Sequence, residues 1–171
     1  MISVPESTSF TWRLSVKTAP EKLRFIIVDF RTSTNSDKTK TPSTFDDVNL
    51  RNAYVMLNSD QYSAVDYNLS FANKKFSKVY DDAALFGVKF FGMDELITQS
   101  NITPSDYKTL YPLFTFNVSK LKEQLKSSVV DIQIKANFTE NVPANTRAYA
   151  LAISDKMLSF PSHGNKMSVI Y

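Results

Sequence analysis

Alternation of polar and apolar residues is clearest in the last third of the chain, between residues 129 and 155. From residue 130 to residue 138, every second position carries valine, isoleucine, alanine or phenylalanine, and the positions between them are polar. This period of two is typical of a β-strand with one buried and one exposed face. Residues 147–155 also alternate, and the stretch between the two segments is rich in turn-forming asparagine and proline. The simplest interpretation is a long antiparallel pair of strands.

The second of these segments carries a row of alanines on one face and larger apolar residues on the other. Ala148, Ala150 and Ala152 form the row. Small side chains allow another surface to approach closely, and that surface could be a neighbouring sheet, a helix of this chain or another subunit. We therefore treat the three alanines as candidate subunit-contact residues.

Further segments show the period of two or are rich in β-branched and aromatic residues, which favours strands. Residues 23–31 are almost continuously apolar, which indicates a central strand buried on both faces. In total we expect about eight or nine strands. Besides the two segments above, they are residues 9–17, 23–31, 48–58, 62–71, 113–118, 157–160 and 167–171.

The hydrophobic period changes to that of a helix in residues 74–91, where apolar residues recur at i, i+3, i+4 and i+7. Asn73 is the expected N-cap, and Gly92 lies where a left-handed residue usually ends a helix. A second, shorter helix is expected near residues 104–110. The long helix either closes one end of the fold or contacts another subunit, and the two roles are equally supported. Its candidate contact residues are Phe76, Tyr80 and Phe90.

Composition indicates one folded domain that is dominated by strands. The chain has 171 residues, of which 43% are hydrophobic and 13% aromatic, so it can bury a substantial core. Only three residues are glycine, although tight two-residue hairpins usually require glycine. Longer crossing connections are therefore expected, and these favour an antiparallel β-sandwich with Greek-key connections.

Charge and cysteine content exclude several classes of function. The chain contains no cysteine, which excludes disulfides, thiolate metal sites and a cysteine nucleophile. The net charge of +3 comes from scattered residues, so nucleic-acid binding is expected to be weak or absent. No apolar run reaches the roughly 20 residues of a membrane span, and the first residues lack the pattern of a signal peptide.

The residues that could support catalysis do not form a recognisable pattern. The single histidine, His163, could act as a base beside a serine, but an exposed turn residue is the favoured interpretation. A calcium site at Asp46, Asp47 and Asn49 is less favoured than an ordinary polar loop. We predict no catalytic residue, no cofactor and no metal site. Adjacent carboxylates occur at Asp46 with Asp47, Asp81 with Asp82, and Asp94 with Glu95, and their spacing does not favour a shared-proton pair. Nothing in the sequence favours Asp29 with Asp131, or Asp46 with Asp155, as facing carboxylates.

Several tyrosines could stack against sugars or bases if the fold exposes them together. In most sandwiches such residues belong to the core or to cross-strand pairs. They nevertheless support a second hypothesis, a carbohydrate- or ligand-binding β-sandwich module. The candidates are Tyr54, Tyr62, Tyr67 and Tyr149.

An ordered set of short motifs, from about Ser9 to the C-terminus, resembles a known family. The set resembles the C-terminal jelly roll of the double jelly-roll major capsid proteins of Polinton-like and adintovirus-like DNA viruses, and of related elements integrated in invertebrate genomes. A double jelly-roll protein carries two such domains, whereas this chain has the length of one. The motifs are residues 11–14 with Trp12, residues 21–32, Phe45 and Asp46, Asn49 and Leu50, residues 57–59 with Tyr62, and residues 140–149 with Asp155.

The resemblance implies an all-β, antiparallel jelly-roll sandwich of about eight strands with one inserted helix. Residues 1–8 would form an N-terminal arm, and residues 9–171 a single jelly-roll domain. The implied function is that of a structural viral or virus-derived capsid protein, without enzymatic activity, which assembles inside the host cell and resides in the virion. Its implied partners are further copies of itself as a trimer or pentamer, a second jelly-roll chain and other capsid proteins. The alternative is the ligand-binding module, as a host protein of viral ancestry.

Overall fold

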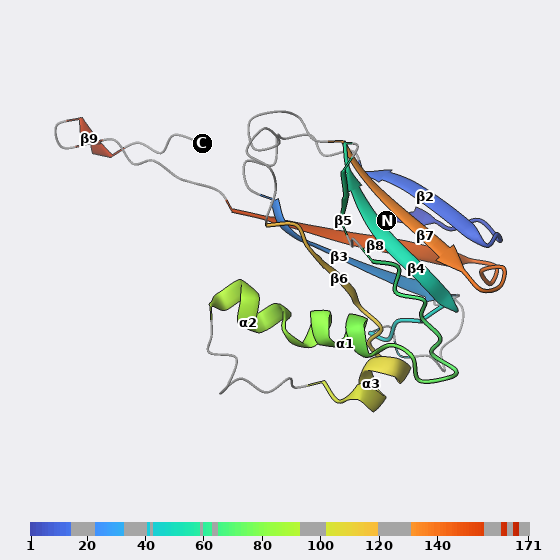
Figure 1. The fold of residues 1–171 in the computed structure, drawn as a ribbon. Coiled ribbons are helices and arrows are strands. Elements are labelled where there is room, and N and C mark those ends of the chain that lie inside the picture. Colours follow the sequence, from blue (N-terminus) through green and yellow to red (C-terminus); the bar gives the residue numbers. More distant parts are fainter. Residues whose placement is uncertain are drawn as a thin grey trace.

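Two four-stranded antiparallel sheets form the body of the protein (Figure 1). The computed structural model describes residues 1–14, 23–32, 41, 43–58, 60–62, 65–92, 102–119, 131–155, 162–163 and 166–167. The first sheet has the spatial order β1 (Ile2–Ser3), β8 (Thr146–Ser154), β3 (Leu23–Thr32) and β6 (Phe114–Asn117). The second has the order β2 (Ser9–Leu14), β7 (Ile132–Phe138), β4 (Leu50–Leu57) and β5 (Asp60–Tyr62). A separate hairpin joins β9 (Ser162–His163) and β10 (Lys166–Met167).

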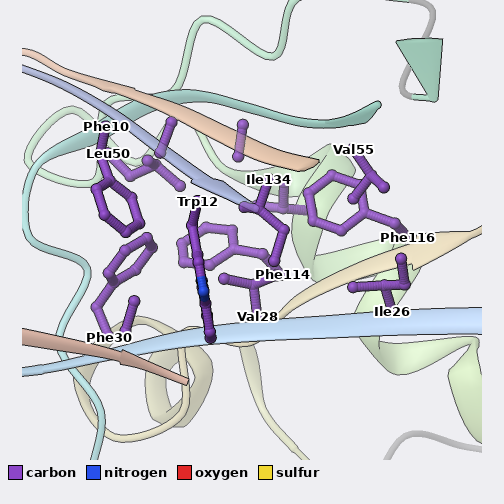
Figure 2. Packing of buried hydrophobic residues seen from close by; sticks show 14 of the residues in the cluster. Phe10, Trp12, Ile26, Val28, Phe30, Leu50, Val55, Phe114, Phe116 and Ile134 are labelled. Atoms are coloured by element: carbon purple, nitrogen blue, oxygen red, sulfur yellow. The ribbon is translucent and has the colours of Figure 1, made fainter. Parts of the chain in front are cut away.

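The hydrophobic core lies between the two sheets (Figure 2). On β7, the four apolar residues of the alternating pattern are all buried, whereas the polar residues between them are partly exposed. Trp12 and Phe10 of β2 face Val28 and Phe30 of β3 across this core. The predicted sandwich is therefore confirmed, because the face that the sequence marks as apolar is the face that the second sheet covers.

Most of the predicted strands form where the sequence placed them. The segments expected at residues 9–17, 23–31, 48–58 and 113–118 contain β2, β3, β4 and β6. β3 pairs with β8 on one side and with β6 on the other, which confirms its central position. The strand predicted at residues 157–160 lies outside the described residues.

The predicted antiparallel pair between the two alternating segments is wrong. β7 pairs with β2 and β4, whereas β8 pairs with β1 and β3 in the other sheet. The connection between them crosses from one sheet to the other, with Val142 buried in the core and Asn145 in a left-handed conformation. Alternation determines which face of a strand is buried, and both sheets satisfy it equally well.

The strand predicted at residues 62–71 is also wrong. β5 begins at Asp60 and ends at Tyr62. Residues 65–69 have no regular structure, and Asn68 adopts a positive φ of 46°, which is incompatible with a continuing strand. Leu69 and Phe71 still bury their side chains in the core, so this irregular segment satisfies the apolar pattern without sheet pairing.

The predicted inserted helix is confirmed, with a later start and an interruption. α1 (Ser77–Ala84) and α2 (Phe86–Phe91) follow each other through Leu85. Lys74 has a positive φ of 58°, so the helix cannot begin at Asn73, and Phe76 occupies the N-cap position. Gly92, at φ 65°, ends α2 in the expected left-handed conformation.

The helices lie together on one side of the first sheet (Figure 1). α3 (Pro104–Thr109) confirms the short helix predicted at residues 104–110, and the Thr103 hydroxyl accepts a hydrogen bond from the Asp106 amide at 3.1 Å as its N-cap. Among the described residues, no helix is long and apolar enough to cross a membrane.

Candidate assembly surface

The side of the first sheet that faces away from the core carries charged, aromatic and exposed apolar side chains close together. Strand register places Arg147, Tyr149, Leu151 and Ile153 of β8 beside Arg31, Asp29, Ile27 and Phe25 of β3, in that order. The intervening residues of β3 point into the core. We call this side the outer face.

One end of the outer face is covered by α2. Phe25 is almost fully buried, although it points away from the core, because the rings of Phe86 and Phe90 pack on it at 5.0 and 6.1 Å between centroids. The Arg24 guanidinium lies over the Phe90 ring at 5.5 Å and contacts the Asp155 carboxylate at 3.4 Å. A second, small apolar cluster therefore fixes α2 to the sheet.

The other end of the outer face carries a cation held by two aromatic rings. The Arg31 guanidinium lies 5.5 Å from the centroid of Phe45 and 5.7 Å from that of Tyr149. Phe45 reaches this position because its own amide binds the Leu110 carbonyl and the next amide, that of Asp46, binds the Phe30 carbonyl, both at 2.9 Å. Such stacking on two rings orients the guanidinium.

Asp29 lies between these two ends and is partly buried. Its Oδ1 atom is shielded from solvent and has no hydrogen-bond partner. Burial raises the pKa of Asp29 to about 6, and the nearby positive charge of Arg31 opposes this rise. The carboxyl group therefore changes its charge just below neutral pH.

Between the covered ends, the outer face exposes apolar surface. Leu151 is 58% exposed, and its neighbour across the sheet, Ile27, is partly exposed. Large apolar side chains that are exposed on a sheet face often take part in protein–protein contacts. Single exposed apolar residues are also found on surfaces that bind nothing. Chemically, the outer face combines an open apolar strip with an oriented cation and a titratable carboxyl group.

The predicted contact residues on β8 lie on the opposite, core-facing side of the strand. Ala148 is fully buried, Ala150 is partly buried, and Ala152 is exposed. Burial therefore decreases along the row from Ala148 to Ala152. Subunit contact by these alanines stays a prediction, and only Ala150 and Ala152 offer side-chain surface for it.

The predicted contact residues of the helical segment lie at increasing distance from the core. Phe76 is buried and stacks on Phe71 at 5.3 Å, and the Tyr80 hydroxyl donates to the Ile102 carbonyl at 2.9 Å. Phe90 is partly buried against Phe25. These contacts support the role of the helical segment in closing one side of the sandwich. A subunit contact by the three residues stays a prediction.

The two acidic pairs that are distant in the sequence do not come together. Asp131 lies beside the second sheet, where bonds from Arg13 at 2.6 and 2.7 Å lower its pKa to about 2, whereas Asp29 lies on the first sheet. Asp46 is near one end of β3, and Asp155 is near the other. Neither combination forms the facing carboxylates of a glycosidase.

The remaining polar candidates have structural partners. Asp46 accepts a bond from the Thr32 amide at 2.7 Å, and Asp47 accepts one from the Asn49 amide at 2.8 Å. In the part of the chain that the structure describes, no group of three histidine or acidic residues is arranged to hold a metal. Asp82 pairs with Lys78 at 2.9 Å. The Asp94 and Glu95 pair and the side chain of His163 lie outside what is described.

The four tyrosines do not form a common stacking surface. Tyr54 accepts a hydrogen bond from the Asn137 amide group at 3.0 Å on the second sheet, whereas Tyr149 lies on the first. Tyr62 and Tyr67 pack against the core. Tyr67 also lines a hollow of about 430 Å³ between α1, β6 and residues 65–67. This hollow would be the place to test the ligand-binding hypothesis.

Sequence reasoning missed the grouping on the outer face. Asp29 and Arg31 are charged residues that follow the apolar run of β3, and that mismatch was the available signal. The contribution of Phe45 had no local signal, because its position depends on hydrogen bonds to residues far away in the sequence.

Comparison with known families identifies the family to which the domain belongs. A family model described as a double jelly roll-like domain matches residues 3–158. This range contains both four-stranded sheets from Ser3 onward, together with the three helices. No curated protein and no solved structure matches the chain.

Proposed function

Because the chain belongs to the double jelly roll-like domain family, we propose that it is a structural capsid protein that associates with itself to form capsomers. The family match carries the proposal, since it extends over almost the whole chain and the family has a capsid-type fold. The proposed location is the virion. The proposed partners are further copies of the chain, a second jelly-roll chain and other capsid proteins.

The packing of the domain is consistent with a rigid building block. Residues from both sheets and from α1 and α3 belong to one continuous hydrophobic core, which includes the aromatic pairs Phe30 with Phe138 and Phe71 with Phe114. A core of this kind resists deformation, because close-packed interiors have low compressibility. The open apolar strip at Leu151 supplies surface that association could cover.

Mass in solution tests the proposal directly. Size-exclusion chromatography with light scattering, over a series of protein dilutions, should show a defined oligomer with a mass three or five times that of the chain, or a larger particle. Electron microscopy of that fraction should then show uniform rings or shells. A single-chain mass at every concentration would contradict self-association of this chain, and a second jelly-roll chain would become the partner to seek.

A further inference from the structure

β8 has an open edge over much of its length. β1 covers only its beginning, because Ile2 pairs with Ala148, Ser3 pairs with Arg147, and the Val4 amide donates to the Thr146 carbonyl at 2.9 Å. In the described structure, no strand lies beside Ala150 to Ser154 on that side, although β3 pairs with β8 as far as Ser154 on the other.

The alternating direction of successive residues in β8 determines which main-chain groups point to this edge. In an antiparallel ladder, alternate residues direct both their N–H and C=O groups to the same side. Since the Thr146 carbonyl points to β1, the corresponding groups of Ala150, Ala152 and Ser154 point to the open edge. Such a row of hydrogen-bonding groups is a template for another strand.

We propose that the open edge of β8 pairs antiparallel with the same edge of a second copy of the chain, about a two-fold axis at Ala152. The inference rests on the proposed self-association and adds a two-fold contact to it, which joins two chains or two capsomers and does not lie within a trimeric or pentameric ring. Ala152 would face the partner's Ala152 and Ala150 would face the partner's Ser154, so that each of these residues both donates and accepts a main-chain hydrogen bond.

The composition of the edge favours a second copy as its occupant. Residues 150–154 carry no charge, whereas exposed edges normally carry charges or proline that prevent pairing. In the proposed register, Leu151 lies opposite the partner's Ile153 on the outer face, and this apolar pair occurs twice because of the symmetry. On the other face, the small alanine side chains let the two copies approach without steric conflict.

The position of β1 favours the axis at Ala152 over an axis at Leu151. An axis at Leu151 would place the partner's Ser154 opposite Ala148, where Ile2 is already paired. The axis at Ala152 uses all of residues 150–154 and leaves β1 in place.

Cysteine cross-linking can test the register, because the chain contains no cysteine of its own. The two Ala152 Cα atoms would be about 5.5 Å apart, which lies within the range that a disulfide can bridge. The two Ala150 residues would be about 14 Å apart, because four residues at roughly 3.4 Å each separate them along the strands and the strands lie about 5 Å apart. Ala152→Cys should therefore form a covalent dimer, and Ala150→Cys is its matched control on the same edge.

Under mild oxidation, we expect at least ten times more disulfide-linked dimer from Ala152→Cys than from Ala150→Cys. Equal or no cross-linking by the two variants, while the wild-type chain still forms an oligomer, would overturn the strand pairing and leave the proposed function intact. A wild-type chain that stays a single chain at every concentration would overturn both.

Hydrogen exchange gives a second test without a substitution. The Ala150 and Ala152 amides should exchange at least ten times more slowly at oligomer-forming concentrations than at high dilution, because the partner strand would bind them. The Leu151 amide, which points towards β3, is the internal control and should remain protected at both concentrations. Exchange at Ala150 and Ala152 that is independent of concentration in an oligomeric sample would overturn the pairing.

Discussion

The charge state of Asp29 depends directly on its position in the fold. Burial raises its pKa from 3.8 to about 6, so the folded chain retains a proton that the unfolded chain loses. The contribution of Asp29 to stability is therefore complete below about pH 4 and is lost as the pH rises through about 6. The direction is opposite to that of a carboxylate with a cationic partner.

Replacement of Asp29 by asparagine should remove this pH dependence. At pH 7.5, Asp29→Asn should be more stable than the wild type by about 1 kcal/mol, because a partly exposed group realises only part of the free energy that its pKa shift implies. At pH 4 the difference should largely disappear. Urea unfolding of both proteins at the two pH values measures it, and a difference that does not change with pH would contradict this account.

Asp131 supplies the control of opposite sign. Its bonds from Arg13 and Gln133 lower its pKa to about 2, so its contribution is present above about pH 4 and is lost as the pH falls towards 2. Asp131→Asn should therefore be less stable than the wild type at pH 7.5. If both substitutions changed stability in the same direction at pH 7.5, local charge would not be the cause.

At the scale of elements, α2 depends on a cluster that is separate from the main core. Phe25 points away from the sandwich, and the rings of Phe86 and Phe90 cover it. The next residue, Phe91, is 71% exposed, and its ring lies edge-on to the ring of Phe90 at 4.9 Å between centroids. Two adjacent phenylalanines on one short helix thus differ strongly in burial.

This difference predicts unequal effects of the same substitution. Phe90→Ala should reduce the free energy of unfolding by about 2 kcal/mol, since it removes a partly buried ring from an aromatic cluster. Phe91→Ala should change it by less than about 0.5 kcal/mol. Chemical denaturation of both variants makes the comparison, and equal losses would show that the ring of Phe91 is packed as well as that of Phe90.

The elements also show where sequence reasoning stops. The helical period correctly identified residues 77–91, but the positive φ of Lys74 and the interruption at Leu85 have no hydrophobic signature. Likewise, Asn68 has a positive φ that a strand does not accommodate, while Leu69 and Phe71 continue the apolar pattern. Periodicity reports which side chains are buried, whereas these deviations occur in the backbone.

At the scale of the whole molecule, burial was easier to predict than pairing. The apolar face of residues 132–138 is the core face of β7, as its alternation indicated. Its predicted partner, β8, belongs to the other sheet because the intervening connection crosses the sandwich. The outer face depends on the same topology, since β8 brings Tyr149 to Arg31 only as a neighbour of β3.

One core joins all parts of the described sandwich, and Trp12 is a natural reporter for it. Trp12 is the only tryptophan of the chain, is 9% exposed, and lies between the two sheets (Figure 2). Its fluorescence therefore reports separation of the sheets, whereas far-UV circular dichroism reports loss of strands and helices. If the sandwich unfolds as one cooperative unit, both signals must change together.

We expect the two signals to give the same urea midpoint, at a protein concentration where the chain has the mass of a monomer. In Phe90→Ala, both midpoints should decrease by the same amount, because the cluster around Phe25 rests on β3 and β3 belongs to the common core. A dichroism change that precedes the fluorescence change only in Phe90→Ala would mean that α2 unfolds independently of the sandwich. Different midpoints already in the wild type would mean that the sheets separate before their strands are lost, and the domain would then be a less rigid building block than its core suggests.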